Sequence, residues 1–136
     1  MTPSEKASLS KVRFNHSEEC LKSAETLLKD SDYKGAANRS YYAIFHALRA
    51  ILVYDDFDSR KHSGIISTFN KLYIKTNIFD KDVSRITSNS FDIRTDSDYN
   101  DFFMISKDGV INQINDTKKV IELIRVYLSN KWSVNP

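Results

Sequence analysis

The chain has 136 residues, with 20 basic and 18 acidic side chains and a formal charge of +2 at pH 7. So small a charge excludes a strong overall field for nucleic acid, and any such binding needs a local basic patch. The single cysteine, Cys20, excludes an internal disulfide, and no apolar run approaches the roughly 20 residues of a membrane span. Three glycines and two prolines favour long helices. We therefore expect a soluble, cytoplasmic chain with no membrane contact. It should form a single helical domain over residues 1–136, with a core from about 5 to 130 and a short C-terminal tail.

Apolar residues recur with helical spacing in five segments of the sequence. The first helix is expected over residues 4–29 with Ser4 as its N-cap, and the second over 33–54 with Asp32 as its N-cap. The apolar stripe expected on the first helix consists of Leu9, Val12, His16, Cys20, Ala24, Leu27 and Leu28. The corresponding row on the second helix consists of Tyr41, Phe45, Leu48 and Leu52.

Three more helices are expected after the second. They cover residues 61–76, residues 81–94 and a final segment capped by Ser106, with a polar loop at 96–103 before the last one. No alternating pattern predicts a strand. Four longer helices with short connections predict an all-α fold, an antiparallel four-helix up-and-down bundle. The 81–94 segment is expected to pack at the side or end of this bundle as one additional short helix.

Arg39 and His46 are the most informative pair in the sequence. His46 follows Arg39 by seven positions, which on an α-helix is about 10 Å of rise and only ~20° of rotation, so both lie on one face with Tyr42 between them. A guanidinium keeps its charge and forks toward phosphate oxygens, whereas an imidazole exchanges a proton near neutral pH. Together the two groups indicate a site that handles a phosphodiester without a metal.

Three stretches, in order along the chain, resemble the HEPN domain family (higher eukaryotes and prokaryotes nucleotide-binding). Asn38-Arg-Ser-Tyr-Tyr-Ala-Ile-Phe-His46 is similar to the family signature, in which an arginine is followed after four to six residues by a histidine on the second long helix. His62-Ser-Gly-Ile-Ile with Phe69 resembles the third helix of the family, and Arg94-Thr-Asp-Ser-Asp-Tyr99 resembles an element before the last helix. The resemblance extends over roughly residues 12–128.

This resemblance implies metal-independent RNA cleavage with Arg39 and His46 as catalytic residues and with no cofactor. Its implied partners are RNA, a second copy of the chain in a homodimer, and a minimal nucleotidyltransferase (MNT) antitoxin, because many bacterial members are toxins encoded beside such a protein. His46 would deprotonate the ribose 2′-hydroxyl, and Arg39 would stabilise charge on the phosphoryl oxygens. Two alternatives remain open: a non-catalytic HEPN module that binds a nucleotide or an MNT-type partner, and a structural helical adaptor.

Two positions depart from the family pattern. Ser40 follows the motif arginine, where active ribonucleases often have Asn, Asp or His, and this leaves room for the non-catalytic module. Leu48 stands two residues after the motif histidine. A known variant has a tyrosine there that the partner modifies with AMP, so that particular regulation is not expected in this chain.

Each candidate residue also has a structural alternative. Arg39 could pair with Asp98 and lock the bundle, and His46 could be a hydrogen-bonded packing residue. Further candidates for RNA or phosphate binding are Tyr42, Asn38, Ser40 and His62. For His62, in a basic cluster at a helix start, a solvated loop position is the favoured interpretation.

Other polar residues are expected to be structural. His16 stands among apolar positions of the first helix. Arg94, Asp98 and Tyr99 are expected to form a tertiary ion-pair and hydrogen-bond element, as the family resemblance implies. The acids Asp92, Asp96, Asp98 and Asp101 do not have the spacing of a calcium loop, so no metal site is expected.

Overall fold

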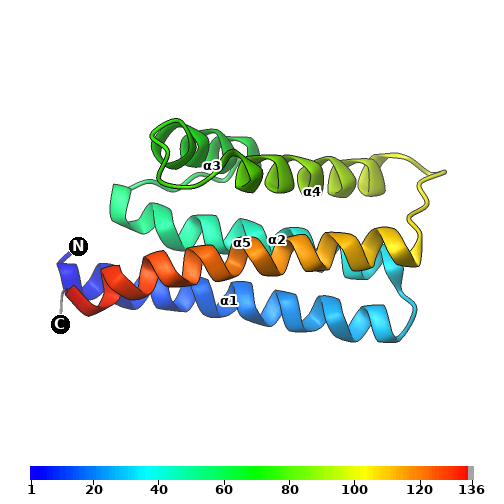
Figure 1. Ribbon diagram of the computed structural model, residues 1–136, viewed down its shortest axis with the longest axis horizontal. Coiled ribbons are helices and arrows are strands. Elements are labelled where there is room, and N and C mark those ends of the chain that lie inside the picture. The colour runs from blue at the N-terminus through cyan, green and yellow to red at the C-terminus, as the bar shows by residue number, and fades with distance from the viewer. Residues whose placement is uncertain (135–136) are drawn as a thin grey trace.

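Five α-helices joined by short turns account for most of residues 1–134, the part of the chain described by the structure, a computed structural model (Figure 1). The helices are α1 (Pro3–Lys29), α2 (Tyr33–Leu52), α3 (His62–Phe69), α4 (Lys81–Tyr99) and α5 (Lys107–Val134). A 3-10 turn, Val53–Asp55, extends α2, and a π-helical turn, Asn70–Ile74, extends α3. Residues 1–134 contain no strand, which confirms the all-α prediction.

The four longer helices alternate in direction along the bundle (Figure 1). α1 and α4 run one way and α2 and α5 run the other, so the start of α1 and the end of α5 lie at the same end of the molecule. The up-and-down bundle with one additional short helix is therefore confirmed, but the short helix is α3 and not the 81–94 segment. α4 continues through the expected polar loop as far as Tyr99, because Arg94 and Asp98 stand one turn apart and pair within the helix, Nε to Oδ2 at 3.2 Å.

α2 is the central element of the bundle, since it contacts α1, α3, α4 and α5. Twelve of its 20 residues are buried, so only a narrow strip of the helix reaches solvent. That strip carries long polar side chains, among them Arg39, Tyr42, His46 and Arg49, all partly exposed. The helix with the strongest apolar packing thus also presents the residues of the family motif.

The buried face of α1 differs from the expected stripe. Its buried residues are Ala7, Ser10, Phe14, Ser17 and Ala24. The Ser10 hydroxyl donates to the Ala50 carbonyl at 2.8 Å, and the Ser17 hydroxyl donates to the Ala43 carbonyl at 2.6 Å. Small side chains let α1 approach α2 closely, and each buried hydroxyl finds an acceptor there. The expected stripe is wrong in two ways, because Val12 is 50% exposed and His16 is exposed rather than structural.

Helix boundaries follow side-chain caps. Asp32 and Ser106 cap α2 and α5 as predicted, accepting from the Gly35 and Gly109 amides at 2.9 and 3.0 Å. Ser4 does not cap α1. Thr2 does so in a reciprocal pair with Glu5, which moves the helix start to Pro3.

At the other end, the chain after residue 130 is helical through Val134. Positions 135 and 136 of the expected tail lie outside the described residues. Among the helices of residues 1–134, none combines the length and apolar character needed to cross a bilayer.

Candidate functional site

Arg39, Tyr42 and His46 lie in a row along the partly exposed strip of α2, as helical spacing predicts. The Arg39 guanidinium carbon stands 4.8 Å from the centre of the Tyr42 ring, and the Tyr42 and His46 rings are 6.1 Å apart between centroids. A guanidinium over an aromatic face is attracted by the ring quadrupole. Tyr42 therefore connects the cation and the imidazole.

Arg39 makes no ion pair within residues 1–134. Its Nη2 donates to the neighbouring Asn38 side chain at 3.0 Å, which leaves the positive charge without a compensating carboxylate. Asp98, the alternative partner weighed from the sequence, pairs with Arg94 instead. Arg39 does not lock the bundle through Asp98, and its charge is available to an anion.

His46 is half-buried, and its Nδ1 is buried with no hydrogen-bond partner among the described residues. Burial lowers the pKa of this imidazole from its ordinary value of 6.5 to about 4. The charge of Arg49 acts in the same direction, followed by His16, Arg39 and His62. At neutral pH the ring is uncharged, so His46 is able to accept a proton.

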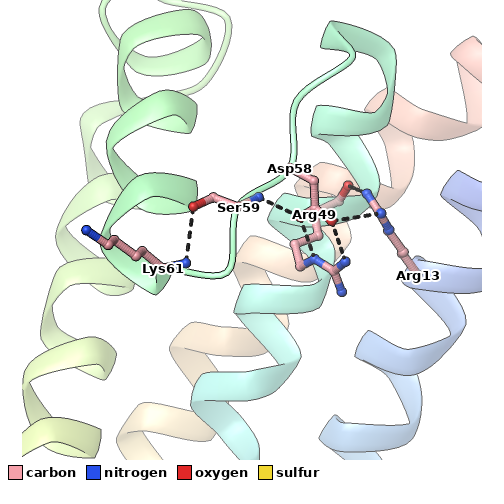
Figure 2. A network of polar contacts seen from close by, with 5 residues as sticks. All are labelled: Arg13, Arg49, Asp58, Ser59 and Lys61. Atoms are coloured by element: carbon pink, nitrogen blue, oxygen red, sulfur yellow. Dashed lines mark hydrogen bonds and ion pairs between the residues drawn. The ribbon is translucent and has the colours of Figure 1, made fainter.

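Arg49 and His16 also surround His46, and sequence reasoning did not assign either to the site. The His16 ring, on α1, lies 5.7 Å from the His46 ring between centroids. Arg49 follows His46 by one helical turn and donates Nε and Nη2 to the two oxygens of Asp58 at 3.2 and 3.0 Å (Figure 2). The spacing of three residues after His46 was the signal that could have identified Arg49.

Asp58 gathers two arginines from different helices. Arg13 on α1 donates Nη2 to the same carboxylate at 3.3 Å, and the Ser59 amide donates to it at 2.9 Å (Figure 2). The bond from Arg49, which outweighs partial burial, lowers the pKa of Asp58 below its ordinary range. One carboxylate therefore holds two guanidinium groups, and that of Arg49 belongs to the turn of α2 that follows His46.

His62 is a packed residue rather than a solvated loop position. Its ring stacks on Phe45 with centroids 4.1 Å apart. Its Nδ1 lies 2.7 Å from the Tyr41 hydroxyl and 3.5 Å from Arg94 Nη1. A guanidinium has only donors, so Nδ1 is the acceptor and Tyr41 donates to it. Burial and the charge of Arg94 lower the pKa of His62. A second imidazole that favours its neutral form therefore packs against α2, the helix of the motif.

Ser40 does not line the site. It is fully buried, and its hydroxyl lies 2.8 Å from the Thr117 hydroxyl on α5. This position points between two helices, because it follows Arg39 by one residue and is turned roughly 100° away around α2. Ser40 therefore has no access to RNA, which corrects its place among the candidate contacts.

The remaining candidates are placed as follows. Asn38 holds Arg39, and Tyr99 is 84% exposed at the end of α4, so Tyr99 takes no part in the expected tertiary element. Within that element Arg94 pairs with Asp98 in its own helix and lies 3.5 Å from His62 Nδ1 on α3. Within residues 1–134 no three His, Cys, Asp or Glu side chains come together as metal ligands.

An open groove of about 600 Å³ lies next to the row of motif residues. Its lining consists of Phe45, Arg49, Asp58, Ser59, Arg60 and His62. It extends from α2 across the loop that leads into α3, so it begins at the residue before His46. The ring of His62, which lines the groove, lies 5.6 Å from the ring of Tyr42 in the row, so the groove and the row are neighbours.

Comparison with known proteins places this sequence in a family. The model of the HEPN domain matches residues 10–127. A UPF0332 protein of Thermotoga maritima is 30% identical over 106 residues, which cover 78% of this chain and 80% of that protein. The chain therefore belongs to the HEPN domain family.

Two relatives from Methanocaldococcus jannaschii carry the name "putative toxin". One is 33% identical over 82 residues, which are 60% of this chain and 61% of the relative. The other is 31% identical over 91 residues, which are 67% and 62% of the two chains. The family assignment from sequence agrees with the observed helical bundle, and proteins named as putative toxins are among the relatives of this chain.

Proposed function

We propose that this protein is an endoribonuclease that cleaves RNA with Arg39 and His46 and needs no metal. The observation that carries the proposal is the row on α2. It joins an arginine without a carboxylate partner to a histidine that is neutral at pH 7, on a strip of helix open to solvent. These groups supply what phosphodiester cleavage requires, a proton acceptor and a fixed positive charge at the phosphoryl oxygens.

In the proposed reaction His46 takes the proton from a ribose 2′-hydroxyl, and that oxygen attacks the adjacent phosphorus. The bond from phosphorus to the 5′-oxygen breaks, which leaves a 2′,3′-cyclic phosphate and a 5′-hydroxyl after the leaving oxygen gains a proton. Arg39 stabilises the charge that develops on the non-bridging oxygens. Tyr42, between the two, stacks on a base or donates to the phosphate.

The leaving oxygen needs an acid as well as the base. A second copy of the chain, related by a two-fold axis near α2, would bring a second His46 into the same groove. We therefore propose a homodimer as the active form. The toxin names of two relatives support a toxin role. We propose an MNT-type nucleotidyltransferase as the antitoxin partner, as the family resemblance implies.

A second candidate function is a non-catalytic module that binds a nucleotide or a partner protein. The low pKa of His46 favours it, because the protonated form that would act as acid is scarce at pH 7. Catalysis then depends on the substrate phosphate to raise this pKa, since a nearby negative charge favours the charged imidazole.

A ribonuclease assay on the purified protein separates the two candidates. Arg39→Ala and His46→Ala should each lose cleavage, by about two to four powers of ten for the histidine, the usual scale of general acid–base help. Arg85→Ala is the matched control, because Arg85 is exposed on α4 and pairs with Asp82. If the protein binds RNA but does not cleave it under any condition, the result favours the non-catalytic binding module.

A further inference from the structure

The groove beside His46 has a positive charge that the motif residues do not explain. Arg49 and Arg60 line it, Arg13 stands behind Asp58, and Asp58 is the acidic residue of its lining. That carboxylate is already shared between Arg13 and Arg49. Arg60 is exposed and makes no ion pair within residues 1–134. Two guanidinium groups and one carboxylate in the lining leave one unit of positive charge, and Arg13 adds a further guanidinium to the same carboxylate from outside the groove.

The groove is in line with the motif row. Arg39 precedes His46 by about 10 Å of helical rise, and Arg49 follows it by about 4.5 Å. Arg49 and His46 stand three residues apart on α2, so they are neighbours on one side of the helix. If one phosphate of an extended RNA contacts Arg39 and His46, a neighbouring phosphate of the same RNA therefore reaches Arg49 and Arg60.

The size and construction of the groove suit a nucleotide unit. A volume of about 600 Å³ lies within the range of small-molecule sites and exceeds what one phosphate fills. The two bonds from Arg49 to Asp58 hold its guanidinium at the groove wall, and Arg60 lines the groove as an exposed side chain. Arginine side chains favour phosphate oxygens, and one guanidinium held in place beside a second, exposed one suits a phosphate group.

We propose that this groove is a second phosphate subsite, which binds an RNA phosphate flanking the cleaved one through Arg49 and Arg60, with Asp58 positioning Arg49. The inference rests on the proposed function, because it assigns a further part of the same RNA substrate. It requires that RNA binding depends on residues outside the Arg–His motif.

The test measures binding without cleavage. A ten-nucleotide RNA with 2′-O-methyl groups throughout is titrated by fluorescence anisotropy at several salt concentrations, so that the attacking hydroxyl is blocked. Arg60→Ala is the informative variant, since this side chain makes no contact that the fold needs. Its Kd should rise roughly three- to ten-fold, and the slope of log K against log salt should fall by about 0.7, the value for one phosphate contact on a single strand. Arg60→Glu should weaken binding further.

Arg85→Ala is the matched control and should bind like the wild type. If Arg39→Ala weakens binding while Arg60→Ala leaves Kd and salt slope unchanged, the subsite is wrong and the proposed function stands. If Arg60→Ala and Arg85→Ala weaken binding equally, the effect is general electrostatics and the subsite is again overturned. If the wild type does not bind the oligonucleotide at all, the ribonuclease proposal and the subsite fail together.

Discussion

Lowering the pH from 7 to 5 should destabilise this protein through His46. The imidazole has a folded-state pKa of about 4, whereas an unfolded chain has the ordinary value near 6.5. As the pH falls through 6.5, the imidazole is protonated in the unfolded state, whereas in the folded state it is protonated only near pH 4. Stability is therefore unaffected by this group above pH 6.5 and is lost progressively between 6.5 and 4.

The size of the effect follows from the two pKa values. Each pH unit in that window costs at most 1.36 kcal/mol, so at pH 5 the upper bound is about 2 kcal/mol. The ring is partly exposed, and solvent screening reduces this to roughly 1–2 kcal/mol. That loss is a sizeable fraction of the roughly 5–15 kcal/mol by which domains are stable.

Urea unfolding at pH 7 and pH 5, followed by circular dichroism, measures the loss. The wild type should lose roughly 1–2 kcal/mol more than His46→Gln, in which the titrating group is gone. His16→Gln, which keeps the His46 ring and removes only a minor contribution to its lowered pKa, should lose nearly as much stability as the wild type. Equal losses in the wild type and His46→Gln would refute the buried, neutral state of His46.

Three further predictions concern the site and its support. Arg39→Lys should cut RNA much more slowly than the wild type in a gel assay, because an ammonium keeps the charge but loses the planar fork; wild-type rates in this variant would contradict the role of the fork. Cleavage should persist in EDTA, and restoration only by added magnesium or manganese would move the chemistry to another site. Ser17→Leu should lose about 1–3 kcal/mol in urea unfolding, because it overpacks the close α1–α2 contact where Ser17 donates to Ala43; unchanged stability would show that this interface tolerates bulk.

The motif row could be predicted because it depends only on helical period. Arg39, Tyr42 and His46 belong to one long helix with clear apolar periodicity, so their shared face follows from spacing alone. The same reasoning failed for part of α1, where Ser10 and Ser17 belong to the core face and Val12 and His16 do not. Serine counts as polar in any hydrophobic pattern, and only the carbonyl acceptors on α2 make its burial favourable.

Other parts of the site depend on tertiary contacts that sequence spacing does not contain. Arg13 and Arg49 come together because Arg13 donates to the Arg49 carbonyl at 3.2 Å and the loop after α2 returns Asp58 to both side chains. His62 was assigned to a basic loop cluster, because its packing against Phe45 requires the position of α3. The length of α4 was missed because its last turn has few apolar residues and is stabilised by the Arg94–Asp98 pair.

A single 2′-deoxy substitution in the RNA tests the central claim most directly. The purified protein is given two strands of the same sequence, one with ribose throughout and one with deoxyribose at the cleaved position, and the products are identified by mass spectrometry. The account predicts a 2′,3′-cyclic phosphate from the first strand and no cut at that position in the second, with both strands bound, because only ribose offers the nucleophile that His46 would activate. Equal cutting of the two strands, or unchanged cleavage by a folded His46→Ala protein, would contradict it.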